Sequence, residues 1–226
     1  MDHPIFSESL RLIGLELARL AAAEPERAAQ LAALTPLERQ VLERCIHSSG
    51  DVSITADLIC SPGACAAGLA ALRAGAPILT DTAMAAAAVA PMAGRTFANP
   101  VRCVLEWAPA SAPAGSTRTA AGIERALAVL PAAVVLIGSA PTALECLLEQ
   151  VAAAAVPTPA LVIGMPVGFV GVAESKRHLA ASGLAQIRLE GSRGGAGLVA
   201  AACNALLRAG WLQAASDPSA AGPTQI

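Results

Sequence analysis

Hydrophobic positions repeat at helical spacing near the start of the chain and form short continuous runs further along. Leu10, Ile13, Leu17 and Leu20 are spaced three or four residues apart, which predicts an amphipathic helix over residues 6–23. Later runs of Val, Ile and Leu are bounded by Gly, Pro, Ser or Asp. Uninterrupted apolar runs of this kind are typical of parallel strands that are buried on both faces.

A second helix has a well-defined predicted start. Thr35 can cap it, Pro36 suits its first position, and Glu38 completes a capping box. The helix is expected to end near Ile46 or His47, because the following Ser, Gly and Asp residues favour a turn.

The rest of the chain alternates between the two element types. Helices are expected from about 61–63 to 75, after 81, and at 117–130, 141–151, 173–181 and 195–207. Strands are expected at 77–80, 101–105, 133–137, 161–164 and 186–189. This alternation predicts a three-layer α/β/α fold with a mainly parallel sheet. One domain over residues 1–209 is expected, followed by a flexible tail over 210–226.

Composition narrows the class of protein. Of 226 residues, 55% are hydrophobic, and the uncharged runs 126–144 and 150–173 are long enough to consider as membrane spans. Prolines interrupt both runs and no signal peptide is apparent, so no membrane association is expected. A net charge of −2 without a basic cluster argues against nucleic acid. Six scattered cysteines with no C-x-x-C pair predict a reducing cytoplasm and no metal site.

Position in the sequence alone identifies few candidate catalytic or binding residues. His47, at a helix end, is either a capping residue or a proton donor favoured by the partial negative charge of that end; position alone favours the cap. The glycine-rich stretch 191–197 could bind an anion or allow close packing. Arg118, next to Thr117 at a helix start, could meet a carboxylate or face water. Residues 174–178 read as an exposed, charged helix face.

Taken in order, several motifs resemble the precorrin-8X methylmutase family, including its cobalt-precorrin-8 branch. The matching stretches are 5–9 (IFSES), 43–47 (ERCIH), 75–81 (GAPILTD), 117–121 (TRTAA), 137–144 (IGSAPTAL), 164–171 (GMPVGFVG), 174–176 (ESK), 193–195 (RGG) and 204–206 (NAL). They extend over nearly all of residues 5–207. The chain departs from the family's usual residues at Leu10, Cys45 and Ser139, the last replacing an Asn.

The resemblance implies a flavodoxin-like fold and a homodimer with its pocket at the subunit interface. It implies an isomerase of cobalamin biosynthesis that moves a methyl group from carbon 11 to carbon 12 of the macrocycle, giving hydrogenobyrinate or cobyrinate. His47 matches the catalytic histidine, Ser9 and Arg44 match substrate-binding positions, and Thr117 and Arg118 resemble further contacts to the carboxylates of the tetrapyrrole. No cofactor is implied.

Two alternatives remain at this point. A corrinoid-binding protein of the same fold would keep the pocket without turnover. A nucleotide-binding module that uses residues 191–197 would instead bind a phosphate ligand.

Overall fold

A computed structural model describes residues 3–216 of the chain. The helices are α1 (Pro4–Ala23), α2 (Pro25–Ala33), α3 (Pro36–Ser49), α4 (Ala64–Arg73), α5 (Ala83–Arg95), α6 (Arg118–Val129), α7 (Pro141–Ala152), α8 (Val172–Ala181) and α9 (Ala196–Ser216). The strands are β1 (Leu58–Cys60), β2 (Ile78–Thr80), β3 (Val101–Cys103), β4 (Val134–Ile137), β5 (Leu161–Gly164) and β6 (Gln186–Leu189). Two 3-10 turns, η1 (Val52–Ala56) and η2 (Val104–Glu106), complete the elements.

The strands form one six-stranded sheet in the order β1-β6-β5-β4-β2-β3. All neighbours are parallel except β1, which pairs antiparallel with β6 at the edge. Numbered among themselves, the five parallel strands follow the order 2-1-3-4-5, which is a common order of doubly wound sheets. The order reverses between β2 and β4, and ligands of such sheets bind beyond the carboxyl ends of the strands at this point.

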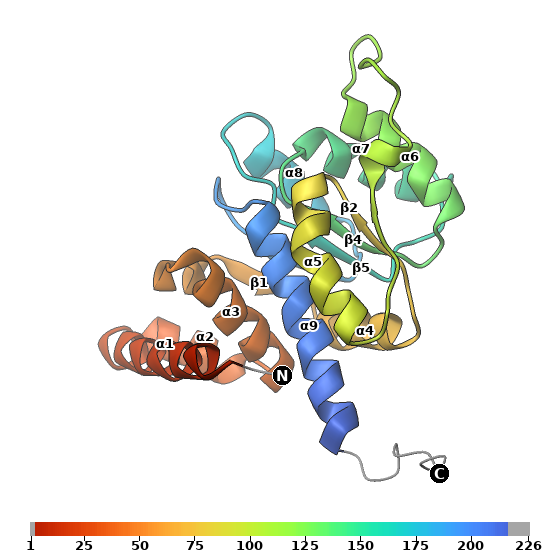
Figure 1. The fold of residues 1–226 in the computed structure, drawn as a ribbon. Helices are drawn as coiled ribbons and strands as arrows, with labels where there is room; N and C mark the ends of the chain where they lie inside the picture. The colour runs from red at the N-terminus through yellow and green to blue at the C-terminus, as the bar shows by residue number, and fades with distance from the viewer. Residues whose placement is uncertain (1–2, 217–226) are drawn as a thin grey trace, which may run out of the picture.

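Alternate residues of the strands divide the core into two halves. Side chains such as Val134 and Leu136 pack with α4, α5 and α9, whereas Val135 and Ile137 pack with α6, α7 and α8. In Figure 1, α9 and α5 lie in front of the sheet, and α6 and α7 lie toward the far side of the molecule from α3. The predicted three-layer α/β/α fold is therefore confirmed.

The N-terminal helices add a fourth layer outside α9. The capping box of α3 is formed as predicted, because Thr35 Oγ1 accepts from Glu38 N and Glu38 Oε2 accepts from Thr35 N. Helix α3 packs against α9, and α1 packs against α3 (Figure 1). The end of α3 is thereby held over the start of α9, where Cys45 Sγ lies 3.9 Å from the carbonyl oxygen of Leu198.

Some predictions about the chain ends were wrong in detail. Helix α9 continues past residue 207 to Ser216, so residues 210–216 are helical rather than part of a flexible tail. The remainder of the predicted tail, 217–226, lies outside the described residues. Strand β1 and helix α2 were not predicted at all.

Helix α9 is the one helix among residues 3–216 that is long and apolar enough to cross a membrane by length and composition. However, 61% of that window is buried inside the protein, between α3 and α5. The two runs considered from the sequence, 126–144 and 150–173, are instead divided among helices, strands and turns.

Candidate active site

His47 lies in the last turn of α3 and points toward α1. Its helix ends at Gly50, which adopts φ 68° and donates its N–H to the carbonyl oxygen of Ile46. Ser49 Oγ donates to the carbonyl oxygen of Cys45, so two of the last carbonyl groups are satisfied without His47. The imidazole is therefore available for another role than capping.

Helix α1 supplies the direct partners of the imidazole. Ser9 Oγ lies 2.7 Å from His47 Nδ1, which fixes the ring and leaves its Nε2 side for another contact. Phe6, one helical turn before Ser9, meets the His47 ring edge-on, with 4.9 Å between centroids and an interplanar angle of 88°. Serine and phenylalanine together hold the imidazole in one orientation.

Two arginines approach the same aromatic ring. The guanidinium carbon of Arg44 lies 4.7 Å from the Phe6 centroid and that of Arg208 lies 5.3 Å from it. Arg44 precedes His47 by one turn of α3, whereas Arg208 comes from α9. The cluster Ser9–His47–Arg44–Arg208 around Phe6 concentrates positive charge where carboxylates could bind.

The protonation of His47 differs from the expectation for a helix end. Burial lowers the pKa of His47, and the positive charge of Arg44 lowers it further. Burial and Arg44 therefore act against the imidazolium form, which the partial negative charge of the helix end favours. A carboxylate bound beside Arg44 would offset part of that charge and raise the pKa again.

Thr117 and Arg118 lie elsewhere in the chain. Thr117 caps α6, with its Oγ1 3.1 Å from Ala120 N, and Arg118 Nε donates to the carbonyl oxygen of Pro109 at 2.9 Å. Helix α6 packs on the opposite face of the sheet from α3 and α9. A single chain brings together three of the five predicted site residues, Ser9, Arg44 and His47. It leaves Thr117 and Arg118 apart, at the start of α6. Figure 1 shows α6 on the far side of the molecule from α1 and α3.

Sequence reasoning missed Asp81, which organises the switch point of the sheet. Its Oδ2 accepts three backbone N–H groups, from Gly138 (3.1 Å), Ser139 (2.6 Å) and Ala140 (2.9 Å). Burial raises the pKa of Asp81, although these three donors oppose the shift. The contact to Ser139 uses its backbone, so it does not depend on the asparagine that the family usually has there.

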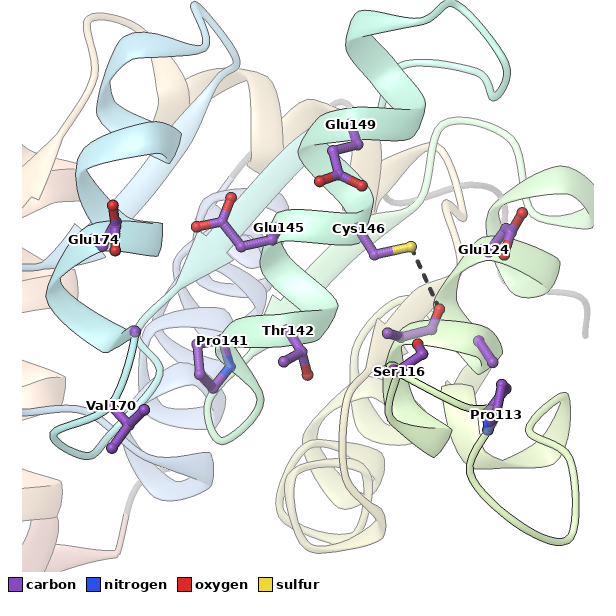
Figure 2. A pocket seen from close by; sticks show the side chains of 14 residues that line it. Pro113, Ser116, Glu124, Pro141, Thr142, Glu145, Cys146, Glu149, Val170 and Glu174 are labelled. Carbon is purple, nitrogen blue, oxygen red and sulfur yellow. Dashed lines mark hydrogen bonds between the residues drawn. The ribbon is translucent and has the colours of Figure 1, made fainter.

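A large cavity lies away from this cluster, among α6, α7 and α8. Its volume is about 590 Å³, and Figure 2 shows the carboxylates of Glu124, Glu145, Glu149 and Glu174 around it. A ligand that carries many carboxylates would be repelled by this lining. The cavity therefore does not suit the predicted tetrapyrrole.

Within residues 3–216, no group of three or more His, Cys, Asp or Glu side chains could hold a metal ion. Their six cysteines are all free. The stretch 191–197 proves to be packed against the loop after β5, because a Cβ on Gly194 would overlap the carbonyl group of Met165. That geometry favours the close-packing interpretation over an open phosphate loop.

Comparisons with known proteins agree on one family. The family model described as Precorrin-8X methylmutase matches residues 5–209. A precorrin-8X methylmutase of Pseudomonas aeruginosa is 47% identical over 183 residues, which cover 79% of this chain and 87% of that protein. A cobalt-precorrin-8 methylmutase of Synechocystis sp. is 35% identical and covers 93% of this chain and 97% of its own. A crystal structure of the precorrin-8X methylmutase of Thermus thermophilus superposes with a TM-score of 0.78 at 36% identity, covering 92% of this chain and 96% of that one.

Proposed function

The chain belongs to the precorrin-8X methylmutase family and is a methylmutase, an isomerase of cobalamin biosynthesis, and we propose that His47 is its acid catalyst. The observation that supports this role is the fixed imidazole of His47, which is bonded to Ser9 and bordered by Arg44. A methyl shift from carbon 11 to carbon 12 needs no nucleophile. It needs a ring held in one geometry and a proton supplied as the conjugation of the ring changes.

The proposed substrate is a tetrapyrrole with many carboxylates, either precorrin-8X or its cobalt form. Arg44 would hold a carboxylate beside His47, and Arg208 stands close enough to take part. Each arginine can present two N–H groups to one carboxylate. The relatives carry both names, so the choice between the metal-free and the cobalt substrate is left to the assay.

We propose that the complete site forms between two copies of the chain in a homodimer. The separation of Thr117 and Arg118 from His47 within one protomer supports this arrangement. Exposed apolar side chains border the His47 side of α1, where Ile5 is 73% and Leu12 is 49% exposed. A second copy, or the apolar ring itself, would cover this surface on assembly. With six free thiols, the proposed location is the cytoplasm.

The test is to mix the purified protein with enzymatically prepared precorrin-8X, or its cobalt form, and record absorption spectra over time. Conversion to the hydrogenobyrinate or cobyrinate spectrum is expected. His47→Asn should lower turnover at least about 100-fold while the ring still binds. His178→Asn is the matched control, because His178 lies on the surface of α8 and pairs with Glu145 of α7. Wild-type turnover by His47→Asn would refute the assigned acid, and a bound but unchanged ring in the wild type would favour the corrinoid-binding alternative.

The shared site can be tested by subunit complementation. His47→Asn and Arg118→Gln are each expected to be nearly inactive alone. Re-paired at random, they should recover roughly a quarter of wild-type activity, because half the dimers are hybrids with one intact site of two. No recovery in demonstrated hybrids would refute a pocket shared between subunits.

A further inference from the structure

Lys176 is the only lysine of the chain, and it is fully buried. The sequence predicted an exposed charged face for residues 174–178, and for Lys176 this was wrong. Burial lowers its pKa to about 8, against weaker opposing effects of Glu190 and Asp57. Lysine is almost never fully buried without compensation, because its charge loses hydration. A buried lysine in a chain that otherwise uses arginine therefore needs a structural reason.

Two carbonyl groups of one loop supply the compensation. Lys176 Nζ donates to the carbonyl oxygen of Gly191 at 2.8 Å and to that of Arg193 at 2.6 Å. Both acceptors belong to the segment 191–195, between β6 and α9. Because one ammonium binds two carbonyl groups two residues apart, it fixes the curvature of this segment.

The same segment is locked to the loop that follows β5. Gly195 N donates to the carbonyl oxygen of Met165 at 2.9 Å, and Gly168 N donates to that of Ser192 at 3.0 Å. The 191–195 segment and the loop after β5 are therefore hydrogen-bonded to each other beyond the carboxyl ends of β5 and β6.

Arg193 connects this segment to the end of α3. Its Nη1 lies 2.7 Å from Asp51 Oδ2 and 2.7 Å from Ser53 Oγ, and its Nη2 pairs with Asp57. Asp51 follows Gly50, which ends the helix that carries His47. Arg193 thus offers one of its own atoms, the carbonyl oxygen, to Lys176, and its side chain reaches the segment that directly follows α3.

We propose that Lys176 is a positioning residue that sets the place of His47 through the 191–195 segment and Arg193. The inference rests on the proposed role of His47. Without the ammonium, the carbonyl groups of Gly191 and Arg193 lose their common donor. The segment then relaxes, and with it the anchor of the α3 end.

The experiment compares Lys176→Met with a matched control, Asn99→Leu. Asn99 is also buried and donates to two carbonyl oxygens, those of Leu72 (2.8 Å) and Ala76 (2.9 Å), but at the amino-terminal edge of the sheet. Both variants should lose thermal stability. Only Lys176→Met should lose kcat, on the order of 10- to 100-fold, with little change in KM, because a small misplacement of the acid affects the reaction more than ring binding.

A second readout does not depend on turnover. The chain has three histidines, so the ring signals of His47 can be assigned in a ¹⁵N-histidine spectrum by their loss in His47→Asn. We expect these signals to shift in Lys176→Met and to stay in place in Asn99→Leu. If Lys176→Met does not fold, Arg193→Gln breaks the next link at a partly exposed side chain and should give the same two results.

The results separate the proposal for Lys176 from the proposed function of the protein. Unshifted His47 signals in the folded Lys176→Met variant, or in Arg193→Gln where only that variant folds, would refute the inference whatever the activity. Shifted signals with wild-type kcat would refute it as well. Absence of turnover by the wild type would instead refute the proposed function and would leave the spectral comparison standing.

Discussion

Replacing Asp81 tests how the switch point of the sheet is held together. One buried carboxylate oxygen accepts the N–H groups of Gly138, Ser139 and Ala140, at the start of the turn that leads into α7. The turn itself is tightly packed, since a Cβ on Gly138 would lie 2.7 Å from Ala196 N. Water therefore cannot easily replace a lost acceptor.

The magnitude follows from counting donors. Asp81→Leu leaves three backbone N–H groups without their acceptor, and a buried donor left unsatisfied costs about 1–3 kcal/mol. Relief from burying a charge returns part of this loss, since burial is the main influence on the Asp81 pKa. The net loss is expected to be about 3–6 kcal/mol of unfolding free energy, a large part of the 5–15 kcal/mol that is typical of domains. Asp81→Asn keeps an acceptor oxygen and should lose only about 1–2 kcal/mol.

Urea unfolding followed by circular dichroism measures both variants. The pH dependence gives an independent check of the same reasoning. Because the folded pKa of Asp81 lies above its ordinary value of 3.8, the folded protein holds this proton more tightly than the unfolded chain. The stability of the wild type relative to Asp81→Asn should therefore rise as the pH falls through the raised pKa of folded Asp81 toward the ordinary value of 3.8. A loss below about 1 kcal/mol for Asp81→Leu, or a stability difference between wild type and Asp81→Asn that shrinks as the pH is lowered, would refute the argument.

Two further changes probe the site and its supporting loop. Ser9→Ala removes the 2.7 Å contact to His47 and should lower kcat roughly 5- to 10-fold, in line with about 1 kcal/mol for one hydrogen bond. The control Ser7→Ala, at an exposed neighbouring position, should keep the wild-type rate. Equal rates for both variants would contradict this. Gly194→Ala should lower the free energy of unfolding measured in urea, because its Cβ would overlap the Met165 carbonyl group. Gly94→Ala, at an open and exposed position of α5, should instead raise that free energy by roughly 0.5–1 kcal/mol. Equal effects at the two glycines would show that the loop is not closely packed.

Local signals in the sequence located most elements, and non-local contacts explain those that were missed. The capping box at Thr35 and the apolar run over β4 are each recognisable from a few neighbouring residues. Strand β1 has three residues and forms only by pairing with β6, far along the chain. Helix α2 begins at Pro25 without a side-chain cap, so it lacks the start signal that marks α3.

Helix α9 shows why a helix end can be misplaced. Gly210 is typical of a helix terminus, which placed the predicted end before it. In the fold, Gly210 lies inside the helix because its missing side chain allows close approach, with a Cβ there only 2.5 Å from Leu69 and 2.8 Å from Phe97. The same error put Arg208 outside the predicted helix and hid its approach to Phe6.

The candidate site was predictable only through motifs, because its parts come from distant segments. Spacing alone gave His47 no partner. The structure supplies Ser9 and Phe6 from α1, and Arg208 from α9 approaches the same Phe6 ring. Lys176 was misread for the related reason that a lysine between Glu174 and Arg177 resembles an exposed helix face. Only the course of the 191–195 segment shows that Nζ has two carbonyl groups to bind.

The lowered pKa of His47 is consistent with its proposed role as an acid once the substrate is considered. Two causes lower this pKa in the free protein, burial first and then the charge of Arg44. A carboxylate of the ring bound to Arg44 would cancel much of the second cause and would place a negative charge near the imidazole. In the proposed complex, the binding of an acidic ring thus itself raises the proton affinity of His47. The proton is then held where the rearranging ring requires it, and the free enzyme need not carry an uncompensated second positive charge beside Arg44.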